Sequence, residues 1–148
     1  MLTATLIALF ERDLNRVVKE LQLYENQLNI WRIEKGIANS TGNLVLHLIG
    51  NLNTYIGNEI SKTGYVRNRE LEFSLKDIPR EELIAQLVNT IKVIKSSLSL
   101  LTADDYQNEY PMLVLPEKTS TEYFMVHLLS HLNYHLGQIN YHRRLIEK

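Results

Sequence analysis

The chain has 148 residues, of which 45% are hydrophobic and 22% charged, which fits one globular domain with its own core. Its 16 Lys and Arg nearly cancel its 17 Asp and Glu, so no basic excess is available for phosphates and we expect no nucleic-acid partner. Cysteine is absent, which excludes disulfides, Cys-ligated zinc and a thiol nucleophile from the chain itself, and is consistent with a cytoplasmic protein.

The first segment, MLTATLIALFERDLNRVV, is apolar for a short stretch and then becomes charged. It lacks the basic region and the cleavage pattern of a signal peptide, so we expect the start of a helix. No apolar run approaches the length of a membrane span, and we expect no membrane partner. Apolar residues at helical spacing extend this helix from about Leu2 to Trp31.

Three more helices are predicted downstream. The second opens at ANSTGNL, which is rich in N-capping residues, and continues to about Ser61. The third begins near Pro79, with Glu81 and Glu82 at its positive end. The fourth opens at TSTE, where Thr119 and Glu122 have the spacing of a capping box, and runs almost to the C-terminus.

The connections between these helices differ in length. The first is short, whereas TGYVRNRELEFSLKDIP and TADDYQNEYPMLVLPEKTS are long. MLVL could pair briefly as an extended edge, and the charges of RNRELEF, with Arg67 and Arg69, fit a solvated run better than an anion site. Four amphipathic helices without a sheet predict an all-α four-helix bundle that occupies residues 1–148 as a single domain, with long loops between helices two and three and helices three and four.

Four of the five histidines lie in HLLSHLNYHLGQINYHRR. At about 100° per residue, His135 lies within the apolar face of the last helix, His131 flanks it and His127 lies nearer its edge. Two histidines four positions apart stand about 6 Å apart at Cβ, so both can reach one ion. We interpret His127 as a polar flank, or as a substrate or supporting contact, and His142 as a surface or helix-end residue.

The fifth histidine, His47, lies in NLVLHLIGNLNTYIG on the second helix. Its face can oppose the last helix and bring three imidazoles together, which is the ligand set of an open, catalytic type of metal site. Asn51 follows one turn later and could bind a ligand or orient a ring. Asp13 and Glu59 are weaker candidates for the same roles. The alternative is that these histidines are polar residues of the core.

The strings NLVLHLIGNLNTYIG, GYVRNRELEF and HLNYHLGQINYHRR together resemble an uncharacterised branch of the DinB-like (YfiT-like) superfamily, over essentially the whole chain. The resemblance implies a left-handed bundle, often a homodimer, with a divalent metal such as zinc or nickel held by His47, His131 and His135. Members with known activity are thiol-dependent transferases and isomerases that use bacillithiol, mycothiol or glutathione, with the thiol bound as its thiolate.

One departure concerns the string HRGQ of that superfamily, which is HLGQ here and lacks a positive group beside the site. The leading hypothesis is a metal-dependent enzyme that transfers a low-molecular-weight thiol to a small electrophile. A metal-dependent hydrolase, with Asp13 or Glu59 as general base, is one alternative. A non-catalytic bundle that binds metal or a small molecule is another, because the sequence shows no dedicated catalytic acid or nucleophile.

Overall fold

A computed structural model describes the whole chain, Met1–Lys148, as an all-helical protein. In chain order its elements are α1 (Leu2–Leu23), a 3₁₀ helix (Gln27–Trp31), α2 (Thr41–Leu52), a π-helical stretch (Asn53–Asn58), α3 (Glu59–Ser61), α4 (Arg69–Ser74), α5 (Arg80–Leu98), α6 (Ala103–Gln107) and α7 (Thr121–Ile146). The one β-type pairing is an isolated bridge between Glu109 and Ser120, so MLVL does not form the extended edge that we considered.

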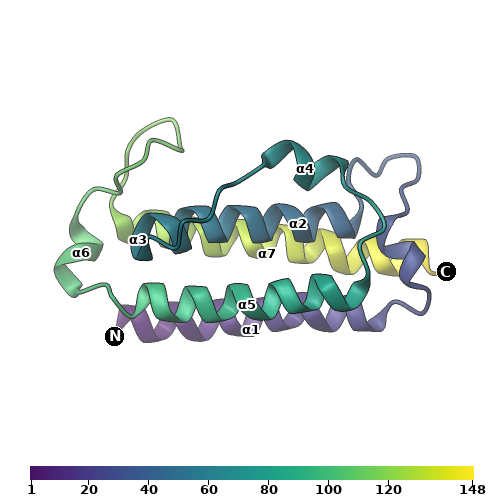
Figure 1. Cartoon of the computed structure of the whole chain (residues 1–148), viewed down its shortest axis with the longest axis horizontal. Coiled ribbons are helices and arrows are strands. Elements are labelled where there is room, and N and C mark those ends of the chain that lie inside the picture. The colour runs from purple at the N-terminus through teal and green to yellow at the C-terminus, as the bar shows by residue number, and fades with distance from the viewer.

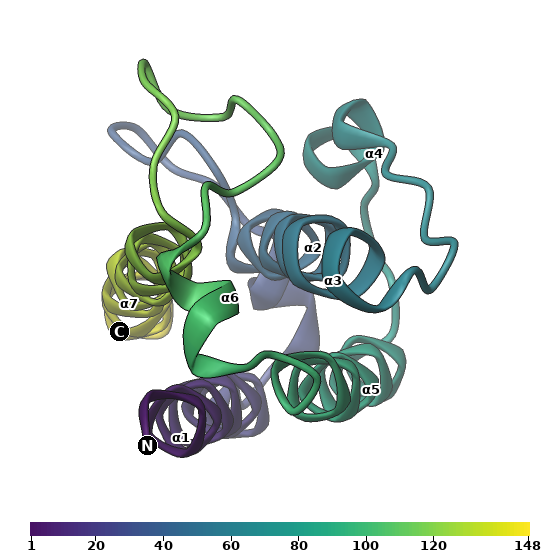
Figure 2. The same cartoon turned by 90° about the vertical axis from the view of Figure 1, so that its left-hand side faces the viewer.

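The long helices lie side by side along the molecule (Figure 1), and the end-on view shows them around a common interior (Figure 2). α1 packs against α5 and α7, and α2 also packs against both. α2 and α5 run in the same direction, so the chain between them returns along the molecule before α5 begins (Figure 1). This returning segment contains α4, which packs on α2.

The apolar stripes of the long helices meet in a cluster of 27 buried hydrophobic residues. Removing one such side chain from water stabilises the fold by about 1.5–3 kcal/mol, so this cluster is the main source of stability. The predicted stripes supply much of it, including Leu6, Phe10, Val17, Leu21, Leu44, Leu48, Leu52, Leu83, Leu87, Ile91 and Ile94.

α2 is buried along its whole length, polar residues included. A helix that is covered on all sides belongs to the interior of a protein. In Figure 2, α5 lies below α2 and α7 lies beside it, and α4 covers the outer surface of α2. Its polar residues, among them His47 and Asn51, therefore face other elements of the protein rather than bulk water.

The first helix ends at Leu23 and not near Trp31, as the periodicity predicted. After this point the Glu147 carboxylate accepts hydrogen bonds from the backbone N–H groups of Glu25 and Asn26, at 2.9 and 3.1 Å. These contacts join the chain just after α1 to the C-terminal end and occupy backbone N–H groups that would otherwise continue the helix. The helical spacing of apolar residues does not reveal these contacts, so the prediction placed the end of the first helix too late.

The second and third predicted helices are found close to their expected bounds. The second stays helical to Ser61 but contains the π-helical stretch Asn53–Asn58. The third begins directly after Pro79, and its first turn holds Glu81 and Glu82, whose charges favour the positive end of the helix.

The cap of the last helix differs by one residue from the prediction. Ser120 is the N-cap, and its hydroxyl accepts the N–H of Tyr123 at 3.1 Å. Thr119 lies outside the helix, where its carbonyl accepts the N–H of Tyr110 at 2.8 Å. The capping box predicted from Thr119 and Glu122 is therefore wrong, although the helix begins where expected.

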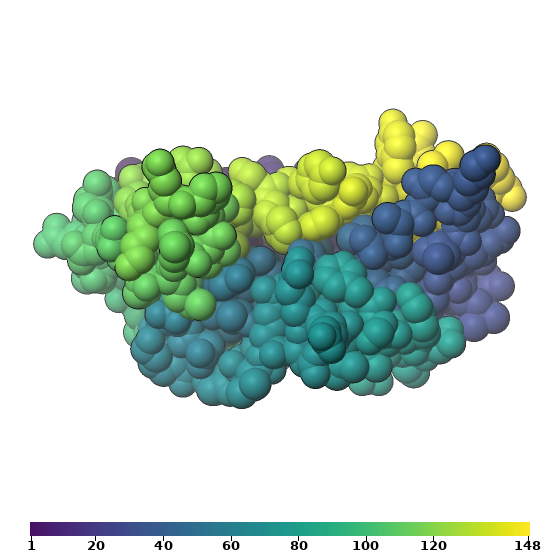
Figure 3. All heavy atoms as spheres, turned by 90° about the horizontal axis from the view of Figure 1, so that it is seen from above, coloured from purple at the N-terminus to yellow at the C-terminus, as the bar shows by residue number.

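Both long connections contain a short helix that the periodicity did not predict. Asn68 caps α4 by accepting the N–H of Leu71, and Thr102 and Asp105 form a reciprocal capping box at α6. Seen from above, the segment with α4 and the segment before α7 lie over the long helices on one face (Figure 3). No helix combines the length and apolar character needed to cross a membrane.

Candidate metal centre

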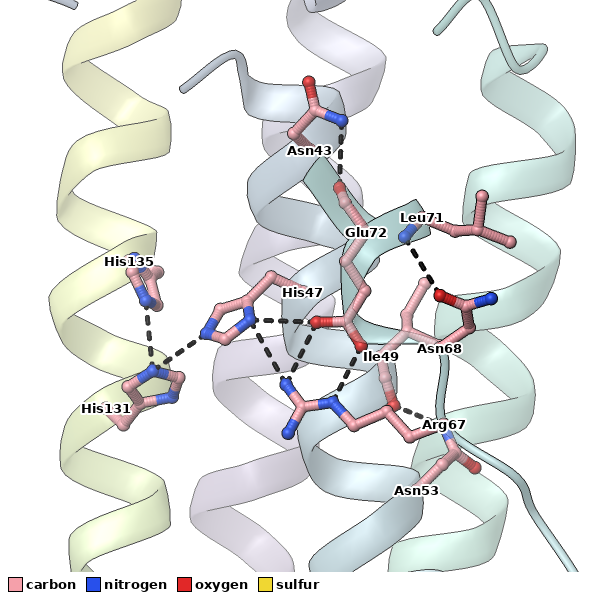
Figure 4. A network of polar contacts seen from close by, with 10 residues as sticks. All are labelled: Asn43, His47, Ile49, Asn53, Arg67, Asn68, Leu71, Glu72, His131 and His135. Atoms are coloured by element: carbon pink, nitrogen blue, oxygen red, sulfur yellow. Dashed lines mark hydrogen bonds and ion pairs between the residues drawn. The ribbon is translucent and has the colours of Figure 1, made fainter. Parts of the chain in front are cut away.

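Three histidines from two helices meet between α2 and α7 (Figure 4). His47 of α2 is buried, and His131 and His135 of α7 are half-buried. The Nε2 atom of His131 lies 3.2 Å from Nε2 of His47 and 3.1 Å from Nε2 of His135. One ring nitrogen from each histidine lies within 4.8 Å of those of the other two. The structure thus brings together the three residues that the sequence singled out.

The spacing of these nitrogens fits a metal ion. Imidazole nitrogens bind zinc at about 2.0–2.1 Å, so two ligands at tetrahedral angles are about 3.3 Å apart. Two of the three separations are already close to this value, and the third pair, His47 and His135, lies within 4.8 Å. The group contains no carboxylate, so three imidazoles would leave a fourth position open.

The ion pair of Glu72 and Arg67 lies on the side of His47 that faces away from the other two histidines, and it selects one tautomer of His47. Its Nδ1 atom lies 3.0 Å from Glu72 Oε1, and Arg67 donates to both carboxylate oxygens of Glu72, at 2.8 and 3.0 Å. Nη2 of Arg67, which can only donate, also lies 3.3 Å from Nδ1 of His47, but the carboxylate contact at 3.0 Å is shorter. Because a carboxylate only accepts, we assign the proton of His47 to Nδ1, so that the lone pair of Nε2 points to the cluster. Burial opposes the charge of Glu72, but the hydrogen bonds from His47 and Arg67 outweigh it and hold its pKa below the usual range.

Burial disfavours the charged form of the two cluster histidines on α7, His131 and His135. Burial, followed by the electrostatic influence of the neighbouring His135 and His47, lowers the pKa of His131 to about 4, so His131 is neutral at pH 7. Burial also lowers the pKa of His135, although its bond to Gln138 opposes this. His135 Nδ1 lies 2.7 Å from Gln138 Oε1, so this nitrogen donates and Nε2 again points its lone pair to the cluster.

The lone pairs of His47 and His135 thus converge on Nε2 of His131. One N–H of His131 can bond to only one of them, and the other lone pair faces no proton. A divalent cation resolves this conflict because it accepts electron pairs from all three nitrogens at once. Three imidazoles suit zinc, nickel, iron or copper better than magnesium or calcium, which prefer oxygen ligands.

Two polar atoms beside the cluster are buried without a partner. They are Nδ1 of His131 and Oδ1 of Asn51, each with less than 1 Å² of accessible surface. A buried polar group without a hydrogen bond costs about 1–3 kcal/mol, so such groups are rare. Both residues line the same cavity, and Asn51 lies one turn after His47.

The carboxylate of Glu72 reaches His47 because α4 lies very close to α2. Asn43 Nδ2 donates to the backbone carbonyls of Glu72 and Leu75, both at 2.9 Å, and fixes the end of α4 (Figure 4). Gly50 faces the carboxylate, and a Cβ atom at this position would lie 1.9 Å from Glu72 Oε2. A glycine is therefore required for Glu72 to occupy its place.

A cavity of about 280 Å³ adjoins the cluster. His47 and His131 form part of its wall, Arg67 and Arg69 come from the segment with α4, and Val114 comes from the segment before α7. The two segments that cover this face in Figure 3 thus also enclose the space next to the histidines. No Asp or Glu lines the cavity.

Of the remaining predicted site residues, His127 lines the cavity, whereas Asp13 and Glu59 do not. His127 lines the cavity and stacks on Phe124, with 5.8 Å between the ring centres, which is compatible with contact to a bound molecule. Asp13 is buried on α1, and its carboxylate accepts hydrogen bonds from Arg12, Arg16 and Asn133. It neither joins the histidine cluster nor lines the cavity, and the same holds for Glu59.

His142 is not at the surface, as we expected from its place near the end of the chain. It is 4% exposed, its Nδ1 lies 2.6 Å from the hydroxyl of Tyr24, and its Nε2 lies 2.7 Å from the carbonyl of Arg32. Burial lowers its pKa, although the Arg32 carbonyl and Glu34 oppose this. The segment after α1 folds over the end of α7 and covers this histidine, which local sequence does not reveal.

The sequence did not identify Glu72, Arg67 or Gln138 as partners of the histidines. Gln138 follows His135 by three residues on the same helix, and this spacing was an available signal. Glu72 and Arg67 lie in RNRELEF, which we interpreted as a solvated charge run. That interpretation is wrong for these two residues, whose side chains are 7% and 14% exposed, and holds for Arg69, which is exposed.

Comparison with known proteins identifies the family of the chain. The chain belongs to the family described as "Protein of unknown function (DUF1572)", whose model matches residues 5–148. None of the curated proteins matches it. The family description names no activity, so a function has to be argued from the residues of the site.

Proposed function

We propose that this member of the DUF1572 family binds a divalent metal ion, zinc or nickel, through His47, His131 and His135, and acts as an enzyme on a small molecule in the adjoining cavity. One observation carries the proposal: three Nε2 atoms converge on one point while Glu72 and Gln138 fix the outer nitrogens of two of the rings. Outer partners of this kind set the tautomer of metal-binding histidines.

The ligand set favours a catalytic over a structural metal. Structural zinc sites are closed by four protein ligands, whereas catalytic sites keep one position for water or substrate. When bound, the ion would supply Lewis-acid chemistry and would make a thiol or water acidic at neutral pH. The protein itself orients the rings through Glu72 and Gln138. The segment with α4 and the segment before α7, which cover the cavity, would hold the small molecule and exclude water.

The reaction class rests on the resemblance to the DinB-like (YfiT-like) superfamily. The packing of α1, α2, α5 and α7, with a long return between two helices that run in the same direction, supports a four-helix bundle of that type. Members with known activity use a low-molecular-weight thiol. This chain has no cysteine, so the thiol would come from outside. We therefore favour transfer of such a thiol to a small electrophile, in the cytoplasm.

The hydrolase alternative has less support from the geometry. It requires a general base near the metal, and neither Asp13 nor Glu59 lines the cavity. Glu72 is close, but its two oxygens already accept hydrogen bonds from His47 and Arg67. A bundle that only stores metal has no need of the cavity beside the cluster.

The proposed homodimer would use the outer face of α7. Tyr123, Tyr134 and Tyr141 lie there with 60%, 67% and 62% of their surface exposed. Tyrosine is enriched at protein interfaces because it combines a large apolar ring with a polar end. We place the contact with a second copy on this face.

The proposal is tested by metal content. Protein purified without an affinity tag would be compared, by plasma mass spectrometry, with a variant in which His47, His131 and His135 are all alanine. His127→Ala is the matched control, because His127 lines the cavity but lies outside the cluster. We expect about one zinc or nickel ion per chain in the native protein and in the control, in accord with one three-histidine site.

The triple alanine variant should contain no zinc or nickel. Metal in all three proteins would place the site elsewhere, and its absence from all three, even after reconstitution, would end the proposal. If the metal is present, a screen of thiols against small electrophiles then tests the reaction. Turnover that needs metal but no thiol would favour the hydrolase instead.

A further inference from the structure

The charge around the proposed metal centre points to the kind of molecule that binds there. The three ligands are neutral imidazoles, so they would leave both charges of a divalent ion uncompensated. Glu72 is the one carboxylate in contact with a ligand, and Arg67 already neutralises it through two hydrogen bonds. The protein thus provides no negative group for the ion.

Two arginine side chains line the same cavity, and one of them, Arg67, lies directly beside His47. The guanidinium of Arg67 is fixed by Glu72 and lies 5.7 Å from the ring centre of Tyr55, and its Nη1 group makes no hydrogen bond within the chain. Arg69 lies over the ring of Phe73 at 5.6 Å and takes part in no ion pair. Two arginines therefore face a cavity that contains no Asp or Glu.

We propose that the small molecule that binds beside the histidine cluster is an anion, whose negative group is drawn to the metal position and to the Arg67 and Arg69 side of the cavity. This inference rests on the proposed metal binding and names its ligand class. A volume of about 280 Å³ is at the lower end of small-molecule sites. Val114, Phe124 and Leu128 supply apolar contacts, so a compact anion with a short apolar part fits best.

Titration calorimetry with succinate and its neutral analogue succinamide tests this inference on the zinc-loaded protein. The two compounds have nearly the same shape and differ in charge. We expect succinate to bind at least about tenfold tighter, since hydrogen bonds to charged groups contribute more than a factor of ten. Arg69→Gln should reduce this preference several-fold. The control is Arg144→Gln, because Arg144 is also exposed and lies over a ring, that of Tyr141, outside the cavity.

The outcomes separate this inference from the metal proposal. Equal affinity for the two compounds in a protein that binds zinc would overturn the anion preference and leave the metal site standing. An unchanged preference in Arg69→Gln, or the same loss in Arg144→Gln, would overturn the role of the arginine wall. A native protein that binds no zinc would end the proposed function and the anion preference with it.

A second inference concerns His131 Nδ1 and Asn51 Oδ1, two of the three buried side-chain atoms without partners. If all three rings bind metal through Nε2, the proton of His131 must lie on Nδ1, which is then a buried donor. Water reaches neither this atom nor Asn51 Oδ1, a buried acceptor in the wall of the same cavity. The two atoms are not bonded to each other in this structure. We infer that, once the rings turn to bind a metal, Asn51 is a positioning residue that accepts the Nδ1–H of His131, so that each of the three rings has a hydrogen-bond partner on the side away from the metal.

The test compares Asn51→Leu, which keeps the size of the side chain, with Thr54→Val. Thr54 is the matched control because its hydroxyl is also buried without a partner, but it does not line the cavity. We expect Asn51→Leu to weaken zinc binding by about 10–100-fold. In the native zinc-loaded protein, the Nδ1 proton of His131 should give a slowly exchanging nitrogen-coupled NMR signal, and Asn51→Leu should lose this protection.

Asn51→Asp, which keeps an acceptor, should restore both properties. Thr54→Val should match the native protein. A protected His131 signal and native zinc affinity in Asn51→Leu would overturn the inference. So would the loss of both properties in Thr54→Val, because the partner of Asn51 would then be the hydroxyl.

Discussion

Replacing Gly50 by alanine should disturb the proposed metal site without touching any of its ligands. The new Cβ would lie 1.9 Å from Oε2 and 2.7 Å from Cδ of Glu72, whereas ordinary contact begins at 3.4 Å. The carboxylate must therefore withdraw by about 1.5 Å. Its hydrogen bond to His47, now 3.0 Å long, does not survive such a shift.

Two opposing contributions determine how Gly50→Ala changes the free energy of unfolding. Alanine is the better helix former by about 1 kcal/mol. Against this, each lost hydrogen bond to a charged group costs about 1.5–3 kcal/mol, and Glu72 makes such bonds to His47 and Arg67. We expect Gly50→Ala to lower the free energy of unfolding by about 1–3 kcal/mol and to weaken zinc binding by about 10–100-fold.

Gly137→Ala provides the matched control. Gly137 also lies inside a helix, α7, but a Cβ there has no atom within 4 Å. This variant should gain about 0.5–1 kcal/mol and keep its metal affinity. Urea unfolding and zinc competition titrations measure both quantities. If Gly50→Ala gained stability as the control does and bound zinc like the native protein, the placement of Glu72 against α2 would be refuted.

Two further predictions concern the buried His142. Tyr24→Phe removes the hydroxyl that lies 2.8 Å from Thr41 Oγ1 and 2.6 Å from His142 Nδ1, so it should lower the free energy of unfolding by about 1–3 kcal/mol, and a loss within the error of urea unfolding would contradict this. The second is a pH dependence of the metal-free protein. Because burial lowers the pKa values of His142 and His131, the unfolded chain binds their protons more readily than the folded protein. Stability should be complete above pH about 6.5, the ordinary value, and should fall as the pH decreases towards about 4. His142→Gln should flatten this dependence in chelator-treated protein, and equal slopes for the variant and the native protein would show that His142 does not contribute.

The long helices and the histidine cluster could be predicted because their signals are local. Helical spacing of apolar residues marks the buried stripes, and the spacing of His131 and His135 places both rings on one face of a helix. His47 required one further assumption, that its helix packs against the last one. The contact between α2 and α7 confirms this assumption.

The partners of these histidines could not be predicted because they depend on contacts between distant segments. Glu72 lies 25 positions from His47 in sequence and reaches it only because α4 returns over α2. Tyr24 lies 118 positions from His142, which it helps to bury. A charged or polar residue carries no local sign that it will be enclosed, so both Glu72 and His142 were expected at the surface.

The residues of the site therefore belong to two parts of the fold, the packed helices α2 and α7 and the two segments that cover them. The metal-binding rings stand on α2 and α7, whose positions the core fixes, whereas Arg67, Arg69 and Val114 lie in the two segments that cover them. Segments outside the core tolerate change better than the helices beneath them. Substitutions in these segments could thus alter which anion binds while the three histidines keep their place. Glu72 is the exception, since it lies in a covering segment and also fixes His47, and a change there should affect the metal and the bound molecule together.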